Sequence, residues 1–439
     1  MVVRPGHSAR FRRMWLTDAC YLRPDGTFGR ADLLVRDGVV AEVAPAGSRP
    51  SDVDCSGYVV LPGLVNGHYH SQATLMRGME AGLELFDWFG DSPGGRAQSR
   101  VGGWLDDPAN LTELADVVRH EYVTLLRHGV TTVADCGSSE AASPTLLADL
   151  GDEVGVRVIA QAYDDWIERV DDPARYTVNI ESEEDLTREF VERAVGWRDR
   201  YRPVFAGHSL ETVARRELAL AAWGRSSIAV LDEHGLLSPR TVLFHGCEMD
   251  ADDVATLART GAAVMHCPVS NLSLHGRIPP AVEWRRAGVT VGLGTDWGDT
   301  DMWGTVRAAW LLQQRLPDQP AYRGADEPGP LSTDRATHAD VLRMATRGGA
   351  LGYSRDDLGE IAPGRTADLV FLDADRLRPY VDGPELSTLA AAVVTSAGPG
   401  VVRHVLTAGE WALRDGAPVR VDADALAATY HRIAAAVTA

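Results

Sequence analysis

The sequence predicts an α/β fold in which a (β/α)8 TIM-like barrel carries a small β-sandwich domain formed by the two chain ends. Three observations predict this fold. Apolar, β-branched runs alternate with helical patterns through the middle of the chain, as in parallel sheets that helices cover on both faces. The number of these units and their span of roughly 300 residues favour a closed barrel over an open sheet. Near both ends of the chain, short strand patterns follow one another with only turn signals between them.

The predicted β-sandwich domain takes its strands from both ends of the chain. Turn signals such as Pro24-Asp25-Gly26 and Asp37-Gly38 separate the first strand patterns. We expect residues 1–61 and 358–439 to form this domain, with a terminal helix at the far end, and residues 62–357 to form the barrel. The strand patterns cover residues 15–22, 31–36, 39–43, 367–372, 401–408 and 410–414.

The predicted barrel alternates buried strands with amphipathic helices. Its strands are continuous apolar runs because both faces of a barrel strand are buried, one by the interior and one by helices. We expect strands at residues 131–135, 156–162, 241–245, 262–266 and 290–295, and helices at 111–128, 183–201, 251–260 and 280–287.

Charge and composition exclude several classes of function. The chain holds 62 acidic and 43 basic residues, for a net charge of −19, so it is a poor candidate for binding the phosphate backbone of a nucleic acid. It contains no lysine. Chemistry that requires a lysine amine, such as a Schiff base, a pyridoxal-phosphate anchor or a phosphate-loop lysine, is therefore excluded.

The cysteines and the apolar runs predict a cytoplasmic protein that does not enter a membrane. Cys20, Cys55, Cys136, Cys247 and Cys267 are odd in number, scattered, and form no Cys-x-x-Cys pair, which is typical of reduced thiols. No apolar run approaches the ~20 residues of a membrane span. The basic stretch at residues 1–13 lacks an apolar signal core.

A His-x-His pair follows the first apolar run of the predicted barrel. Residues i and i+2 of a strand point to the same face, so His68 and His70 would present two imidazoles side by side at a strand end. Imidazole is a ligand that suits zinc and iron. A single His-x-His motif is also common on protein surfaces and in cores. Whether it indicates a metal site therefore depends on which other residues accompany it.

Further histidines and acids end other predicted strands. His208 lies three residues before Glu211, His245 ends the run 241–245, and Asp296 follows the run that begins at Val289. The carboxyl ends of barrel strands converge on one site. If the barrel forms, these side chains and the His-x-His pair are brought together there.

With these residues in place, the sequence resembles the amidohydrolase superfamily over nearly its whole length. It is most similar to the mononuclear branch that holds methylthioadenosine/S-adenosylhomocysteine deaminases, guanine and cytosine deaminases, and s-triazine hydrolases. The matching segments are 61–70 (LPGLVNGHYH), 75–78 (LMRG), 244–246 (FHG), 266–272 (HCPVSNL), 294–296 (GTD) and 359–370 (GEIAPGRTADLV).

The resemblance implies one divalent metal ion, zinc or alternatively iron, and a hydrolytic deamination of a small heterocyclic substrate. The implied metal ligands are His68, His70, His208 and Asp296, and the implied catalytic residues are Glu211, His245 and Asp296. Glu211 would move protons to the substrate, His245 would orient the attacking water, and Asp296 would accept a proton from it. Binuclear members commonly bridge two metals with a carboxylated lysine, which this chain lacks. A homodimer is a further expectation from the resemblance alone.

The segment between Val158 and His245 is shorter than the resemblance requires, and two alignments compete for it. In the first, residues 207–212 form the fifth barrel strand with His208 as a metal ligand, residues 176–181 form the fourth, and a helix covers 183–201. In the second, residues 202–216 match the fourth strand, and the fifth strand with its metal histidine is missing. The site would then be incomplete, and the chain could be a degenerate barrel without turnover.

The substrate is left open by the sequence. An aminated purine, pyrimidine or related nucleoside is one class. The stretch after Trp88 does not contain the substrate-binding glutamate of nucleoside-type deaminases at a recognisable position, so the sequence does not establish a nucleoside substrate. A dechlorinating or dealkylating s-triazine hydrolase and a cyclic amidase are alternatives that keep the same site. Trp297 and Trp303 either stack on a flat ring or belong to the core, and His275 is a candidate for the pocket mouth.

Overall fold

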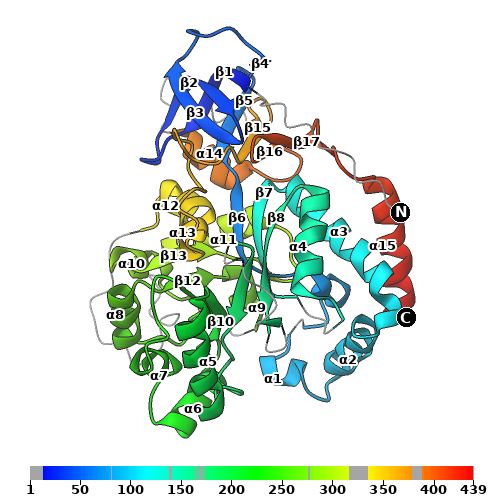
Figure 1. The fold of residues 1–439 in the computed structure, drawn as a ribbon, viewed down its shortest axis with the longest axis vertical. Helices are drawn as coiled ribbons and strands as arrows, with labels where there is room; N and C mark the ends of the chain where they lie inside the picture. Colours follow the sequence, from blue (N-terminus) through cyan, green and yellow to red (C-terminus); the bar gives the residue numbers. More distant parts are fainter. Residues whose placement is uncertain are drawn as a thin grey trace.

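The computed structural model describes residues 13–80, 82–137, 141–163, 166–167, 172, 174–274, 277–315, 335–377 and 388–438. Within these residues the strands form two sheets, which Figure 1 shows as a barrel ringed by helices and a smaller sheet beside one end of it. The parallel sheet comes from the middle of the chain, and the mixed sheet comes from its two ends. The α/β prediction is therefore confirmed.

The parallel sheet closes into a barrel of eight strand positions within the described residues. Its strands pair in chain order, and β14 pairs with β6, so the last strand returns to the first. The first barrel strand begins at Leu64, and only Gly63 separates it from β5, the last strand of the N-terminal end. The strands are β6 (Leu64–His70), β7 (Val130–Asp135), β8 (Arg157–Ala162), β9 (Tyr176–Asn179), β10 (Phe205–Ser209), β11 (Thr241–His245), β12 (Ala263–His266), and β13 (Thr290–Leu293) with β14 (Asp296–Trp297) as two halves of one position.

Two of the expected barrel elements differ from the prediction. The run 290–295 is not one strand, because it breaks at residues 294–295 between β13 and β14. The helix expected at 183–201 begins at Arg188, because Thr187 caps it by accepting a hydrogen bond from the Phe190 amide at 3.2 Å. Glu183 is buried instead, where it accepts a hydrogen bond from the amide of Leu210 at 2.8 Å.

Helices form the outer layer around the barrel (Figure 1). Their ends carry the expected signals: Ser143 caps α4 by accepting from the Leu146 amide, and Gly155 ends it in the left-handed conformation. The helices of the barrel region are α1 (Leu85–Trp88), α2 (Pro93–Leu105), α3 (Leu111–Arg127), α4 (Pro144–Val154), α5 (Arg188–Tyr201), α6 (Val213–Trp223), α7 (Ser227–Glu233), α8 (Ala251–Thr260), α9 (Pro268–Leu274), α10 (Ala281–Arg286), α11 (Met302–Arg315), α12 (His338–Arg343) and α13 (Gly349–Gly352), with 3-10 turns at Ser71–Met76 and Pro108–Asn110 and a π turn at Met344–Gly348.

The barrel interior is packed with apolar side chains, so it is a core and not a pore. Phe244 of β11 and Met265 of β12 are fully buried there. The cluster consists of Ala134, Cys136, Ile159, Val204, Ala206, Val242, Phe244, Ala263, Met265 and Tyr353. Polar side chains take over at the carboxyl end of the strands, where the candidate site lies.

The two chain ends form one mixed sheet with a core of its own, as predicted. β5 and β15 lie side by side at the middle of this sheet and join its N-terminal and C-terminal halves. The C-terminal helix α15 (Ala423–Val437) packs instead on α3 of the barrel. The remaining elements are β1 (Arg13–Leu22), β2 (Phe28–Arg36), β3 (Val39–Pro45), β4 (Val53–Asp54), β5 (Tyr58–Pro62), β15 (Leu369–Asp373), β16 (Val402–Thr407), β17 (Glu410–Arg414), β18 (Ala417–Pro418) and α14 (Leu389–Ser396).

Among the described residues, no helix combines the length and the apolar character that crossing a bilayer requires. All five cysteines are buried free thiols. The domain boundary predicted at residue 62 falls on the last residue of β5.

Candidate metal and catalytic site

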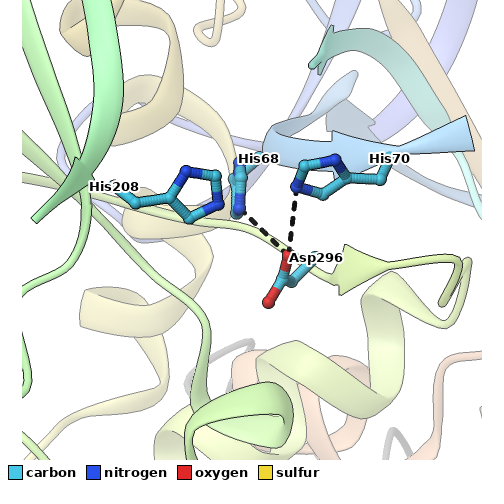
Figure 2. Close-up of side chains that lie close together, drawn as sticks. All are labelled: His68, His70, His208 and Asp296. Carbon is cyan, nitrogen blue, oxygen red and sulfur yellow. Dashed lines mark ion pairs between the residues drawn. The ribbon is translucent and has the colours of Figure 1, made fainter. Parts of the chain in front are cut away.

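Four side chains converge at the carboxyl end of the barrel: His68 and His70 from β6, His208 from β10, and Asp296 from β14 (Figure 2). Their ligand atoms all lie within 4.8 Å of one another. The Asp296 Oδ1 atom is 3.0 Å from His68 Nε2 and 3.6 Å from His70 Nε2. The His68 and His208 ring centroids are 4.8 Å apart. The structure thus has a fifth barrel strand that carries His208, as in the first alignment. The strand is Phe205–Ser209 and not the expected 207–212, so Glu211 lies in the segment after it.

The donor set fits a metal ion. His70 Nδ1 donates a hydrogen bond to the Gly137 carbonyl oxygen at 2.8 Å, so Nε2 is the ring nitrogen that faces the carboxylate of Asp296, on the side where a shared metal ion would lie. Atoms that each lie about 2.1 Å from one zinc ion are at most about 4.2 Å apart, and both measured separations satisfy this limit.

The surroundings of His68, His208 and Asp296 favour the protonation states that a metal needs. Burial lowers the pKa of His68 to about 4, although the Asp296 carboxylate opposes the shift. Burial likewise lowers the pKa of His208 well below its ordinary value, and His68 adds to the effect. Burial alone would raise the pKa of Asp296, but its neighbours, His68 foremost, hold it well below its ordinary range. Neutral imidazoles and an ionised carboxylate are the states that ligate metals.

Hydrogen bonds across the first and last strands hold Asp296 beside the histidines. Asn66 donates through Nδ2 to Thr295 Oγ1 at 2.7 Å and accepts from the Thr295 amide at 3.0 Å. Gly294 permits the approach, because a Cβ there would lie 2.8 Å from His68 Cβ. The break between β13 and β14 is therefore a fixed feature that aims the carboxylate into the barrel mouth.

The backbone is strained at two of the predicted catalytic residues. Asp296 has φ 70° and His245 has φ 66°, a left-handed region that residues other than glycine rarely occupy. Such conformations cluster at functional sites, where the surrounding structure enforces them. In both cases the turn comes at the carboxyl end of a barrel strand.

Glu211 and His245 lie beside the four-residue cluster, on the side of Asp296. Their ligand atoms and those of Asp296 lie within 4.8 Å of one another. His245 Nδ1 donates to Asn271 Oδ1 at 2.9 Å, so its Nε2 lone pair faces Glu211 Oε1 at 3.6 Å. This Nε2 is buried and makes no hydrogen bond within the described part of the chain, so it is free to accept one from water.

A buried arginine that sequence reasoning missed holds the glutamate. Arg215 is 6% exposed and forms an ion pair with Glu211 Oε2 through one guanidinium nitrogen. Its other nitrogens contact Glu184 Oε1 at 2.8 and 3.1 Å. The spacing of four residues, from Glu211 just before α6 to Arg215 in its first turn, was a signal that the pair could form, but the burial of the pair is a property of the fold.

Two adjoining cavities lie over this cluster. The first, of about 150 Å³, is lined by the reactive groups His70, His208, Glu211 and Asp296 and by apolar side chains. The second, of about 260 Å³, lies on the far side of Trp297. Trp88, Leu274 and Trp297 line both cavities.

The predicted pocket residues have different outcomes. Trp297 lies 5.1 Å from the His70 ring, centroid to centroid, and lines both cavities. Of the two alternatives for Trp303, the structure favours core packing, because Trp303 is fully buried in α11 and lines neither cavity. His275 lies outside the described residues. Glu80 lines the second cavity and was not predicted, because it follows a 3-10 turn that has no sequence signature.

Comparisons with known proteins identify relatives of this chain. The chain is 29% identical to an 8-oxoguanine deaminase of Pseudomonas aeruginosa, over 97% of this chain and 99% of that one. It is 32% identical to a 5-methylthioadenosine/S-adenosylhomocysteine deaminase of Haloarcula marismortui, over 91% of this chain and 92% of that one.

Two solved structures share the fold. An adenosine deaminase of Xanthomonas campestris with bound zinc has a TM-score of 0.81 and 23% identity, and the match covers 96% of this chain and 98% of that one. An atrazine chlorohydrolase of Arthrobacter aurescens complexed with zinc has a TM-score of 0.78 and 20% identity, over 97% and 100%. The model of the amidohydrolase family matches residues 59–412. This chain therefore belongs to the amidohydrolase family.

Proposed function

We propose that this protein is a metal-dependent hydrolase that removes an amino group, as ammonia, from an aminated heterocycle such as a purine, a pyrimidine or a related nucleoside. The observation that carries the proposal is the grouping of three imidazoles and a carboxylate around one point, with a second carboxylate and a fourth imidazole beside them. The named activities of the two relatives, both deaminases of heterocycles, support it.

We propose His68, His70, His208 and Asp296 as the ligands of one divalent ion, and zinc as that ion. Three imidazoles with one carboxylate suit zinc, and the two solved neighbours were determined with zinc bound. Such an ion lowers the pKa of a bound water toward ~7, so that hydroxide is available at neutral pH.

The residues around the cluster have complementary roles in the proposed reaction. His245 accepts a hydrogen bond from the water through its buried Nε2 and orients its oxygen toward the substrate carbon. One proton of the water passes to Glu211, which delivers it to the ring nitrogen next to that carbon, and Asp296 accepts the other and passes it on to the amino nitrogen. A carbon–oxygen bond forms and the carbon–nitrogen bond breaks, so that the amino group leaves as ammonia and a lactam remains.

Glu211 is positioned for this transfer by its ion pair with Arg215. The guanidinium occupies Oε2, which leaves Oε1 on the side of His245 and Asp296. One oxygen of the carboxylate is thus fixed, and the other faces the place where a substrate ring would lie.

Two finer expectations accompany the proposal. We propose the cytoplasm as the location, because five free cysteines without a disulfide are typical of a reducing compartment. The homodimer stays a prediction, which analytical ultracentrifugation of the purified protein would test.

The first test is the metal content of the purified protein, measured by elemental analysis on the wild type, on His208→Ala and on His431→Ala as a control. His431 is exposed on α15, far along the chain from the candidate site. We expect about one zinc per chain in the wild type and the control, and loss of zinc in His208→Ala. Ammonia release from a panel of aminated heterocycles should follow the metal.

Other outcomes would redirect the proposal. A wild type that binds no metal after reconstitution would favour a barrel without turnover. Metal retained by His208→Ala would assign His208 to substrate contact. Release of chloride or of an alkylamine from s-triazines, without ammonia from any heterocycle, would replace deamination with the alternative leaving group.

A further inference from the structure

A third cavity, of about 400 Å³, lies between the barrel and the mixed sheet, and we call it the junction cavity. Pro62 and Arg285, which line it, precede the barrel strands β6 and β13, so it lies at the amino end of the barrel, away from the candidate site. Its other walls are residues 22–26 between β1 and β2, α12, the π turn and residues 359–360. Its volume is within the range of about 300–1,000 Å³ that is usual for ligand sites.

Four arginines line the junction cavity: Arg23, Arg285, Arg343 and Arg347. They come together in a chain whose net charge is −19. Burial lowers the pKa of Arg285, and the charges of Arg343 and Arg286 add to the effect, so these cations are close enough to repel one another. An anion placed among them would relieve that repulsion.

Two of the acids that line the cavity are engaged in local structure. Asp340 pairs with Arg285, and it accepts hydrogen bonds from the amide and the hydroxyl of Thr337, at 2.8 and 2.7 Å, as part of the capping box of α12. Asp25 accepts from the amide and the hydroxyl of Thr27, at 2.9 and 2.7 Å. Neither carboxylate is therefore a free counter-charge for the remaining arginines.

The third acid, Glu360, is shared by three arginines. Its Oε1 atom is 3.6 Å from Arg347 Nε and 3.9 Å from Arg343 Nη1, and its Oε2 atom is 3.7 Å from Arg365 Nε. All three separations exceed the length of a hydrogen bond. Within the described residues this is the only ion pair of Arg343, and the guanidinium of Arg23 has neither an ion pair nor a hydrogen bond. Two guanidinium groups at the cavity thus keep donors that a ligand can use.

The two groups are held on separate elements that pack against each other. Gly26, in the turn after Arg23, has φ 86°, and a Cβ on it would lie 3.0 Å from the Cβ of Ala339 in the first turn of α12. Arg343 lies in the last turn of the same helix. The chain continues from there as the π turn, a conformation that is frequent at functional sites. The contact between the turn and α12 therefore fixes the walls from which Arg23 and Arg343 reach the cavity.

The chemistry of these donors defines the ligand. A guanidinium group only donates, keeps its charge at every physiological pH, and matches the oxygens of a carboxylate or a phosphate. A phosphate monoester carries a charge of about −1.5 to −2 and three terminal oxygens, so it can accept from several arginines at once. A carboxylate has one charge and two oxygens. Cations on separate elements therefore favour the phosphate, and the volume of the cavity leaves room for a small organic group attached to it.

We propose that the junction cavity binds a phosphate group, either the free ion or the phosphate of a small organic molecule, with Arg23 and Arg343 as its hydrogen-bond donors and Arg285 as a nearby cation. The site lies apart from the barrel mouth, and its ligand is not the substrate of the proposed deamination. The proposal therefore stands or falls independently of the proposed function.

The test is isothermal titration calorimetry of the zinc-loaded protein with ribose 5-phosphate, inorganic phosphate and ribose, at constant ionic strength. None of the three carries an aminated ring, so none is a substrate of the proposed reaction. We expect ribose 5-phosphate or inorganic phosphate to bind at one site per chain, and ribose not to bind. Arg23→Gln and Arg343→Gln should each weaken the binding about tenfold or more, because each removes a hydrogen bond to a charged group.

Two further variants act as controls. Arg259→Gln changes an arginine in the last turn of α8 that pairs with one acid, as Arg343 does on α12, but lies outside the junction cavity. It should keep the wild-type affinity. Asp25→Asn removes a negative charge from the cavity wall and keeps an oxygen for Thr27, so it should tighten the binding a few-fold. A gain in affinity cannot result from loss of folding.

The outcomes decide both the site and the source of the phosphate. Tighter binding of ribose 5-phosphate than of inorganic phosphate, lost in the two arginine variants, would identify a phosphorylated molecule as the ligand, and the reverse order would identify the free ion. Inorganic phosphate can also bind a zinc ion. Binding that Arg23→Gln and Arg343→Gln leave unchanged would therefore belong to another site and would overturn the proposal. Absence of binding by both phosphates, or equal binding of ribose and ribose 5-phosphate, would overturn it as well.

Discussion

The two cavities over the barrel mouth are built in different ways. The reactive cavity has its floor on the carboxyl ends of strands: His70 on β6, His208 on β10 and Asp296 on β14. The second cavity takes Glu80 from the segment after a 3-10 turn and Trp88 from a four-residue helix. The barrel strands thus supply the candidate reactive groups, and connecting segments line the space beside them, as loops commonly do at the mouths of barrel enzymes.

The two sets also differ in how firmly they are held. His70 is fixed through the Gly137 carbonyl, and Asp296 follows a pair of hydrogen bonds between Asn66 and Thr295. Trp297 belongs to both sets, because it follows Asp296 on the same short strand. Changes in the first set should therefore affect every substrate equally, and changes in the second should alter the choice among substrates.

The largest effect is expected from Glu211→Gln. The amide keeps the size of the side chain but cannot shuttle protons, and general acid–base catalysis contributes about 10²–10⁴ in rate. We expect kcat to fall by about that factor for every substrate, with the metal content unchanged. Steady-state kinetics and elemental analysis on the same preparation would measure both quantities.

Glu217→Gln is the matched control for this variant, since Glu217 lies on α6 six residues further along the chain and lines neither cavity. It should retain wild-type kcat. A Glu211→Gln protein that kept its kcat within threefold would remove the glutamate from the proposed proton transfer.

A smaller effect is expected from Asn66→Ala. The substitution removes both hydrogen bonds to Thr295 and frees the segment that carries Asp296. Partners that orient metal ligands typically change metal affinity by about 10–100-fold. We expect a loss of zinc affinity in that range, measured by competition with a chromogenic chelator, and equal loss of activity toward all substrates at limiting zinc. Unchanged affinity would show that the strand break holds its shape without Asn66.

The four-residue cluster was predictable from the sequence because each of its residues lies at the end of a strand pattern. His68, His70, His208 and Asp296 were found in this way, and the closed barrel brings them together. The second cavity was not predictable by the same route. Glu80 lies in no periodic segment, and Trp303 was chosen beside Trp297 although only burial distinguishes a core tryptophan from one in a pocket.

Helix α2 was missed for a related reason. Ser92 and Pro93 are ordinary start signals, but Gly94, Gly95, Gly102 and Gly103 weaken the helical pattern that follows. The structure explains two of these glycines: a Cβ on Gly94 would collide with the carbonyl oxygen of Met79, and a Cβ on Gly95 would lie 2.8 Å from the carbonyl oxygen of Trp88. Close packing of α2 on the α1 segment therefore required a residue that sequence patterns count against a helix.

The smallest expected effect tests whether the packing of α2 on α1, called here the α1–α2 corner, supports the second cavity. Ser92 caps α2 by accepting a hydrogen bond from the Gly95 amide at 2.9 Å. Ser92→Ala should cost about 1 kcal/mol of stability. Gly95 packs on the backbone of Trp88, which lines both cavities. We therefore expect KM for an aminated heterocycle to rise a few-fold while kcat and zinc content stay constant.

Ser143→Ala removes the equivalent cap of α4, which lines neither cavity, and should cost about the same stability. Chemical denaturation would confirm that the two variants lose similar free energies of unfolding. If KM rises in Ser92→Ala alone, the α1–α2 corner positions the residues that line the second cavity. If KM rises equally in both variants, general loosening of the fold accounts for the change, and the α1–α2 corner has no such role.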